Sequence, residues 1–220
     1  APLYTAICER TGLDAHLVGE VVLGCVTQYG EQAGNIAKTS ALYAGFPSQV
    51  SGLTITRFCS SGLDAINVAA LKINAGQEQV ALAGGIEMMS RIPMMSDQAA
   101  IFADPKVALS ARILLMGSGA DLIASLQGAS RAMVDEVALL SQQRASHATN
   151  AGFFKSIIAI DNPTKKCIVR TDECIRPQTT MESLAQLPPS FAEIGRAGAD
   201  AVQLAHYDHL TAISHVHTAA

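Results

Sequence analysis

A cysteine stands where a short β-branched run meets the start of a helical pattern, a position that could make it a nucleophile. Cys59 follows the run at residues 54–58 and directly precedes Ser60 and Ser61, a residue type that often caps helix N-termini. A thiol at a helix N-terminus meets the positive end of the helix dipole, which favours the reactive thiolate. The alternative is an inert structural cysteine at a strand–helix turn, because free cysteines are among the most buried residues.

Four histidines gather near the end of the sequence and could in principle hold a metal ion. They are His206, His209, His215 and His217, and the last two would share one face of a strand. No cysteine pair or helical H-E-x-x-H pattern accompanies them, which favours a polar loop that leads into an edge strand. We expect no metal site.

Two further features allow both a functional and a structural interpretation. Gly84-Gly85 follows an expected strand and could cradle a phosphate, but neither of the common nucleotide-binding glycine patterns is present, which favours a tight turn. Arg176 could bind a phosphate through its guanidinium group, or it could form a surface ion pair with a nearby carboxylate.

The composition excludes several classes of protein. The chain has 220 residues, of which 49% are hydrophobic and 15% are charged, and its net charge is −4 without a cluster of basic residues. This balance argues against nucleic-acid binding, and no apolar run reaches the roughly 18 residues of a membrane span. Five scattered cysteines without a C-x-x-C pair argue against a disulfide framework and favour a reducing compartment such as the cytoplasm.

The first part of the chain alternates strands with helices, a pattern typical of a parallel α/β sheet. The expected helices are residues 1–12, 35–44 and 60–75, and the expected strands are residues 20–26, 53–58 and 79–83. The helix over 60–75 carries only Asp64 and Lys72 as charges, so we expect it to be covered on more than one side.

After Ser90 the pattern changes to an irregular, methionine-rich segment and then to helices. The expected elements are helices at 119–126, 133–151 and 181–187, a hairpin that pairs 157–160 with 167–170 around Pro163, and a weakly strand-like segment at 204–220. We therefore divide the chain into an α/β domain at residues 1–90, a second lobe at 91–200 and a return segment at 201–220.

Several strings occur in the order in which one family carries them. Residues 57–63, RFCSSGL, resemble the nucleophile motif of thiolases, and residues 83–91, AGGIEMMSR, are similar to their glycine–glycine–glutamate stretch. Further similar segments are residues 34–47, 116–117, 141–145, 172–191 and 218–220. Lys38 and Met88 depart from the arginine and the serine that are common in the family.

The resemblance implies a thiolase-like layered α/β fold, the first half of an αβαβα arrangement, with an inserted α+β loop domain that binds coenzyme A. It implies acyl transfer between coenzyme A thioesters, which forms or cleaves acetoacetyl-CoA or another 3-ketoacyl-CoA through an acyl-enzyme on Cys59. By the same resemblance, Arg176 and Ser183 contact the nucleotide part of coenzyme A, and Met116 and Phe191 line the pantetheine channel. Acetyl-CoA is then a substrate, no cofactor is covalently bound, and the full-length protein is a homodimer or homotetramer.

The sequence lacks two motifs from the second half of thiolases. None of its six histidines lies in a Gly-His-Pro context, and no other cysteine lies in a Cys-x-Gly context. We therefore expect the C-terminal thiolase domain to be absent and the chain alone to lack turnover. The alternatives are a thiolase-like coenzyme A-binding or assembly protein without turnover, and a ketosynthase-type condensing enzyme; the segments at 88–91 and 176–191 favour a thiolase.

Overall fold

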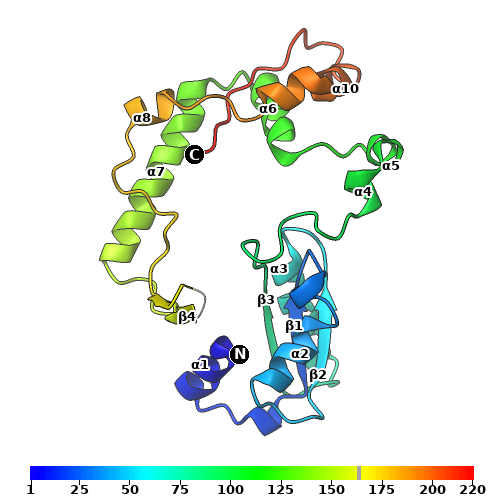
Figure 1. The fold of residues 1–220 in the computed structure, drawn as a ribbon, viewed down its shortest axis with the longest axis vertical. Helices are drawn as coiled ribbons and strands as arrows, with labels where there is room; N and C mark the ends of the chain where they lie inside the picture. The colour runs from blue at the N-terminus through cyan, green and yellow to red at the C-terminus, as the bar shows by residue number, and fades with distance from the viewer. Residues whose placement is uncertain (163–164) are drawn as a thin grey trace. The chain divides into compact units, whose positions relative to one another are not determined.

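The computed structural model describes residues 1–162 and 165–220, which form two compact units, Ala1–Asp104 and Pro105–Ala220 (Figure 1). The first unit contains, in chain order, α1 (Pro2–Thr11), η1 (Ala15–Leu17), β1 (Glu20–Gly24), η2 (Gly30–Gln32), α2 (Ile36–Tyr43), β2 (Ser51–Ile55), α3 (Ser61–Asn74), β3 (Ala81–Gly85) and α4 (Ala100–Ala103). Its three strands form a parallel sheet in the order β2-β1-β3. The α/β fold class predicted from the alternation is confirmed.

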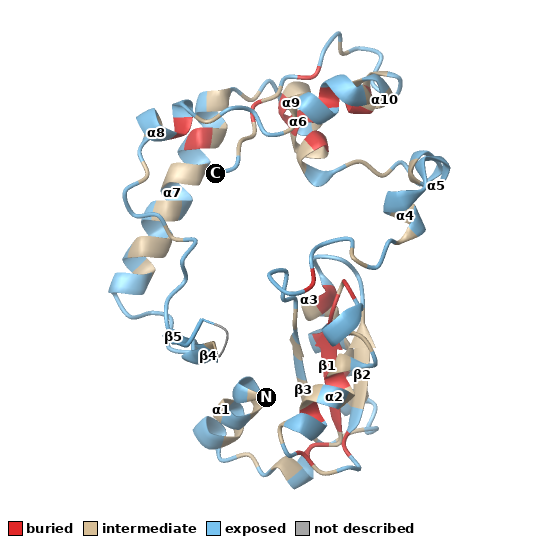
Figure 2. Cartoon of the chain, in the orientation of Figure 1, coloured by how far each residue is buried: buried red, intermediate tan, exposed pale blue. Residues whose placement is uncertain are grey.

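Strand β1 lies at the centre of this sheet and is covered on both faces. All five of its residues are buried, and Figure 2 shows the buried positions gathered along it. Val21 packs in a cluster with Ala37 of α2, whereas the next residue, Val22, packs with Ala65 of α3. Because successive side chains of a strand point to opposite faces, α2 and α3 cover opposite sides of the sheet.

Helix α3 is covered on one side only, so the expectation of a helix covered on more than one side is wrong for this chain. Its small residues Ala65 and Ala69 pack against the sheet, while Leu63, Ile66 and Leu71 are 61%, 53% and 66% exposed. The scarcity of charged residues in this helix therefore reflects an exposed apolar face and not a second layer of packing.

The first turn of α3 lies directly against the end of β1. A Cβ atom on Gly24 would lie 2.4 Å from the carbonyl carbon of Ser61 and 2.6 Å from the backbone nitrogen of Gly62. Only glycine allows this close approach, because backbone atoms cannot move aside as a flexible side chain can. The contact fixes the start of α3 at the carboxyl end of the sheet.

We predict that Gly24→Ala destabilises the first unit by about 1–3 kcal/mol, because the new methyl group must push the start of α3 away from β1. Gly84→Ala is the matched control, since a Cβ at Gly84 would meet only the Leu23 side chain at 3.6 Å, an ordinary contact. Urea denaturation of both variants measures the difference. Equal free energies of unfolding would contradict the close packing.

The second unit is mainly helical. It contains α5 (Pro105–Ser110), α6 (Met116–Gln127), α7 (Arg131–Asn150), β4 (Ile160–Asn162), β5 (Cys167–Val169), α8 (Met181–Ala185), α9 (Ala192–Ile194), the π-helical turn η3 (Gly195–Ala199) and α10 (Asp200–Leu204). The antiparallel pair β4–β5 confirms a hairpin in this segment, but its first strand is at 160–162 and not at the predicted 157–160; Pro163 lies outside the described residues. Residues 205–220 form no strand, so the weakly strand-like prediction is wrong; side-chain hydrogen bonds hold this segment instead.

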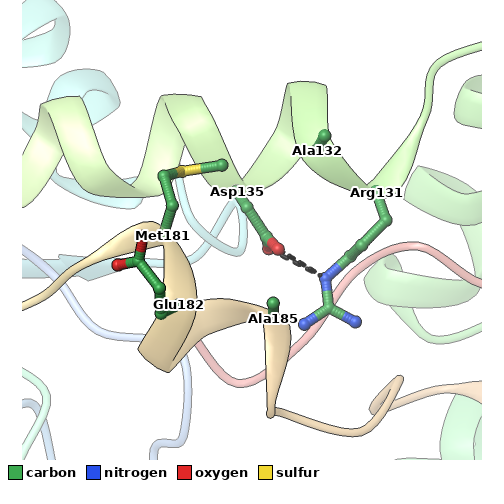
Figure 3. Close-up of a pocket in the computed structure, with 6 residues that line it drawn as sticks. All are labelled: Arg131, Ala132, Asp135, Met181, Glu182 and Ala185. Carbon is green, nitrogen blue, oxygen red and sulfur yellow. Dashed lines mark hydrogen bonds and ion pairs between the residues drawn. The ribbon is translucent and has the colours of Figure 1, made fainter.

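Arg131 of α7 holds the end of α8; Figure 3 shows this arginine with its partner Asp135. Arg131 forms an ion pair with Asp135 one turn further along α7, at 2.8 Å. Its guanidinium group also donates hydrogen bonds to the carbonyl oxygens of Leu184 and Leu187, the latter at 2.9 Å. These carbonyls lie at the end of α8, where no further helical turn supplies donors, so Arg131 fixes the position of α8.

Within the described part of the chain, no helix has both the length and the hydropathy needed to cross a bilayer.

Candidate functional site

Cys59 lies in the tight connection between β2 and α3, and its side chain is exposed. The preceding residue, Phe58, has a φ of 48°, in the left-handed region that bulky side chains rarely adopt. Backbone strain of this kind costs about 1–3 kcal/mol and persists only where the surroundings impose it. The turn therefore holds Phe58 in a conformation that the local sequence alone does not favour, and this conformation sets the position of Cys59.

Ser61 is the residue that imposes this turn. Its buried hydroxyl group accepts a hydrogen bond from the Arg57 backbone nitrogen at 2.8 Å and donates one to the Phe58 carbonyl oxygen at 2.6 Å. Ser60 is the N-cap residue, as predicted, but its side chain forms no cap hydrogen bond; it donates instead to the Arg57 carbonyl oxygen at 3.1 Å. Cys59 consequently sits one residue before the N-cap of α3.

A glutamate ties the strand ends together at the same edge of the sheet. Glu87, just after β3, accepts hydrogen bonds from the Val26 backbone nitrogen at 2.8 Å and from the Gln32 side chain at 2.9 Å. Burial alone would raise the pKa of this carboxyl group, but the hydrogen bonds from Gln32, Val26 and Thr27 outweigh burial and lower it. The sequence did not point to this role, although a charge two residues after the Gly84-Gly85 pair was its visible sign.

The Gly84-Gly85 pair lies within β3, so the tight turn expected after the strand is wrong, although the pair does allow a close approach to neighbouring backbone. A Cβ atom on Gly85 would approach the Gly24 carbonyl oxygen to 3.2 Å. The pair therefore permits close packing between neighbouring strands, in addition to the tight contact between β1 and α3.

The five cysteines are all free and differ strongly in accessibility. Cys25, at the end of β1, is 1% exposed, and burial together with the nearby Glu87 charge raises its pKa to about 11. Such a thiol is protonated and inert near neutral pH. Exposed thiols are found at Cys59, Cys167 and Cys174.

We predict that iodoacetamide at pH 7.5 modifies Cys59 before the other thiols and Cys25 last. Cys59 is exposed at the start of α3, whereas burial keeps Cys25 protonated and out of reach. Peptide mass spectrometry over a time course measures the order, and denatured protein is the control in which the order should disappear. Faster labelling of Cys25 than of Cys59 in the native protein would contradict the burial of β1.

Two of the expected ligand-binding residues lie together in one groove of the second unit. Arg176 and Ser183 line a hollow of about 720 Å³ between α7 and the segment around α8, a volume within the usual range for small-molecule sites. The Ser183 hydroxyl also completes the cap of α8, since it donates to the Thr180 carbonyl oxygen at 2.8 Å and accepts from the Thr180 nitrogen at 3.0 Å. A smaller hollow of about 460 Å³ lies beside Arg131 and Asp135 (Figure 3).

The other two expected residues, Met116 and Phe191, are not among the described residues that line this groove. The Phe191 ring lies against Gly117, where a Cβ atom would come within 1.9 Å of a ring carbon. Met116, the adjacent residue at the start of α6, is 77% exposed.

Arg176 is exposed, and within the described part of the chain no carboxylate forms an ion pair with its side chain. Its backbone nitrogen donates to the Gln142 side chain of α7 at 2.7 Å, which fixes the main chain at this point. The surface ion pair that was the alternative for Arg176 is therefore absent from the described residues.

Two of the four clustered histidines converge on one buried carboxylate. Asp121 of α6 is fully buried, and its oxygens lie 2.9 Å from His215 Nδ1 and 2.7 Å from His217 Nδ1. The backbone nitrogens of Val216 and His217 also donate to Asp121, each at 3.1 Å. The second ring nitrogen of His215 lies 3.0 Å from Asp200. Among the described residues, no group of histidine, cysteine and carboxylate side chains is arranged to hold a metal ion. The hydrogen bonds of His215 and His217 to Asp121 fasten the terminal segment to α6.

The charges of this cluster stabilise one another. Burial alone would raise the pKa of Asp121, but the hydrogen bonds from His217 and His215 outweigh it and lower the pKa. Burial alone would lower the pKa of His215, but its bonds to Asp121 and Asp200 outweigh burial and raise the pKa. Because both ring nitrogens of His215 face carboxylate oxygens, both must carry a proton, and the ring is an imidazolium in this arrangement.

The fold and these features define an α/β protein that presents an exposed cysteine at a helix N-terminus, together with a helical unit that carries a ligand-sized groove. Residues 1–204 match the model of a known family, the thiolase N-terminal domain, and the chain therefore belongs to the thiolase family.

Known relatives agree with this assignment. The chain is 36% identical over 214 residues to the 3-oxoadipyl-CoA/3-oxo-5,6-dehydrosuberyl-CoA thiolase of Escherichia coli, a match that covers 88% of this chain and 53% of that protein. It is 38% identical over 207 residues to the beta-ketoadipyl-CoA thiolase of Pseudomonas aeruginosa, covering 86% and 52%. The crystal structure of the Bacillus anthracis acetyl-CoA acetyltransferase superposes with a TM-score of 0.74 at 34% identity, covering 86% of this chain and 51% of that one. The chain thus spans about half the length of these relatives.

Proposed function

We propose that this chain supplies the nucleophile and the coenzyme A groove of a thiolase-type acyltransferase. The observation that carries the proposal is the presentation of Cys59: an exposed thiol one residue before the N-cap of α3, on a turn fixed by the buried Ser61. The family membership and the thioester substrates in the relatives' names support the same chemistry.

In the proposed reaction, the Cys59 thiolate attacks the carbonyl carbon of an acyl-CoA thioester. A carbon–sulfur bond forms to Cys59, and the tetrahedral oxyanion collapses with cleavage of the bond to the sulfur of coenzyme A. The departing coenzyme A thiolate takes up a proton, and the acyl group remains on Cys59 as a new thioester. Coenzyme A or the carbanion of acetyl-CoA then accepts the acyl group, which gives thiolysis or condensation respectively. The backbone N–H of Cys59 lies near the helix N-terminus and would help to stabilise the oxyanion.

We propose that coenzyme A lies in the groove of Arg176 and Ser183, whose guanidinium and hydroxyl groups suit a phosphate. Met116 and Phe191 would contact the pantetheine chain.

The chemistry uses the side chains of the protein and the substrate's own thioester, with no covalently bound cofactor. The active protein would be a homodimer or homotetramer in a reducing compartment such as the cytoplasm, in keeping with five free cysteines.

We further propose that the 220-residue chain alone does not turn over. The sole histidine of the first unit is His16, which lies in η1 before the start of β1, whereas Cys59 lies beyond the other end of that strand. A histidine base must be within hydrogen-bond reach of the thiol to activate it repeatedly. Purified chain that cleaves acetoacetyl-CoA catalytically would contradict this proposal.

The test of the groove is coenzyme A binding by isothermal titration calorimetry. Arg176→Ala should weaken binding by about tenfold, because a charged hydrogen bond to phosphate is lost. Arg170→Ala removes another exposed cation that does not line the groove and serves as the control. Equal affinity of all three proteins would overturn the assignment of the groove. Binding without any acyl transfer to Cys59 would instead support a coenzyme A-binding protein without enzymatic function.

A further inference from the structure

One histidine belongs both to the groove and to the buried carboxylate cluster. His217 lines the groove together with Arg176 and Ser183, and its Nδ1 atom lies 2.7 Å from Asp121 Oδ1. Its side chain is 31% exposed, whereas that of Asp121 is completely buried. The ring therefore bridges the protein interior and the space where a ligand would lie.

Asp121 determines how this ring is oriented. A carboxylate only accepts hydrogen bonds, and the same oxygen already accepts the backbone N–H groups of Val216 and His217, both at 3.1 Å. The Nδ1 atom of His217 must therefore carry the proton of the shared hydrogen bond. Nε2, on the opposite side of the ring, is left as the nitrogen that can interact with a bound molecule. A carboxylate that fixes the tautomer of a histidine in this way is a common means of aiming its other nitrogen.

The other walls of the groove indicate what that molecule is. Apolar side chains line it on several sides, namely Met133, Val134, Val137, Leu184 and Leu187. Polar groups come from Arg176, Ser183 and Gln142. An elongated ligand with apolar carbon chain, hydrogen-bonding groups and anionic phosphate matches this combination, and coenzyme A has all three.

We propose that His217 is a ligand-contacting residue of the groove: its Nε2 atom forms a hydrogen bond with bound coenzyme A, and Asp121 is the positioning residue that aims it. The proposal rests on the proposed function, since it assumes that coenzyme A occupies the groove. It adds a residue to which the family resemblance did not assign a ligand contact.

A pair of variants separates ligand contact from a merely structural role. In His217→Asn, the side-chain amide nitrogen lies about where Nδ1 was, so the bond to Asp121 is kept while Nε2 is lost. In His217→Gln, the longer amide reaches about to the position of Nε2, and the bond to Asp121 is lost. A structural tether would suffer more in His217→Gln, whereas a ligand contact suffers more in His217→Asn.

The experiment measures, for each variant, coenzyme A affinity by calorimetry and the melting temperature of the Pro105–Ala220 unit. His217→Asn should bind about tenfold more weakly than the wild type, as expected for one lost hydrogen bond to a ligand, with a melting temperature close to that of the wild type. His217→Gln should keep more of the affinity but melt earlier. His209→Ala, which removes an exposed histidine outside the groove, should match the wild type. Repeating the titrations with pantetheine and with adenosine 3′,5′-bisphosphate identifies the half of the ligand that His217 contacts.

Nitrogen-15 NMR of the histidine rings gives a readout that a structural role would not move. On addition of coenzyme A, the Nε2 resonance of His217 should shift while its Nδ1 resonance stays in place. Unchanged affinity of His217→Asn for coenzyme A and both fragments, with Arg176→Ala still weakened, would overturn the role of His217 and leave the proposed function standing. Absence of coenzyme A binding by the wild type would overturn both.

Discussion

Cys59→Ala is expected to abolish the transfer of an acetyl group from acetyl-CoA to the protein. In the wild type, incubation with excess acetyl-CoA should add one acetyl group, and peptide mass spectrometry should locate it on Cys59. Removal of a nucleophile from an enzyme that forms a covalent intermediate slows the reaction by about a thousandfold or more. The effect should be this large because no neighbouring side chain of the turn can replace the thiol: Ser60 and Ser61 both use their hydroxyl groups to hold the backbone.

Two matched variants make this experiment specific. Cys174→Ala removes another exposed thiol and should leave the acetylation of Cys59 unchanged. Ser61→Ala keeps the thiol but removes the hydrogen bonds to Arg57 and Phe58, so it should slow acetylation without abolishing it. Acetylation of Cys167 or Cys174 while Cys59 stays unmodified would contradict the nucleophile assignment.

Asp121→Ala is expected to destabilise the Pro105–Ala220 unit by about 3–5 kcal/mol, the usual cost of removing one partner from a buried charge pair. The carboxylate is completely buried and has donors from two imidazole rings and two backbone nitrogens. Its loss leaves His215 facing Asp200 alone and releases the terminal segment from α6. Because His217 and Ala220 line the groove, coenzyme A binding should weaken as well.

Denaturant titration followed by circular dichroism measures this change in the free energy of unfolding. Asp208→Asn is the control, because its side chain is fully exposed and such surface changes stay within about 0.5 kcal/mol. A difference of less than about 1 kcal/mol between the two variants would show that the Asp121 cluster does not hold the unit together.

The same cluster predicts how stability depends on pH. The pKa of His215 is raised in the folded chain, so its contribution is complete below the unfolded value of about 6.5 and is lost as the pH rises through the folded pKa. The pKa of Asp121 is lowered, so its contribution is complete above about 3.9 and is lost as the pH falls through the folded pKa. The second unit should therefore be most stable between about pH 4 and 6.5. His215→Asn should remove the loss on the alkaline side; an unchanged profile would contradict the sign of the shift.

The sequence predicted the elements that local patterns define. Strand β1 was visible as an unbroken apolar run, and Gly12 and Asn35 mark the end of α1 and the start of α2 as their residue types suggest. The position of Cys59 before α3 was likewise predicted, because strand, serines and helix follow each other directly. These features depend on residues that are close together in the sequence, so they can be predicted from one amino-acid sequence.

The features that were missed depend on contacts between residues far apart in the sequence. Asp121 and His217 are 96 positions apart, and nothing near Asp121 in the helical pattern of α6 distinguishes it from a surface aspartate. The prediction that α3 is covered on more than one side was wrong, because a shortage of charged residues does not show which apolar side chains pack against another element. Glu87 lies within the AGGIEMMSR segment at residues 83–91. Its hydrogen bonds with Val26 and Gln32 join residues that are distant in the sequence, so only the folded structure reveals them.

The division into the units Ala1–Asp104 and Pro105–Ala220 has a consequence for how the chain unfolds. The first unit has its core around β1, while the cluster of Asp121, Asp200 and the His215 imidazolium lies in the second. Two cooperative units in one chain do not obey a two-state description, so a single melting temperature is not a defined property of the molecule. Heating at several pH values between about 6.5 and 8 should instead resolve two transitions. The transition of the second unit should move as the contribution of His215 is lost, while that of the first unit stays nearly fixed.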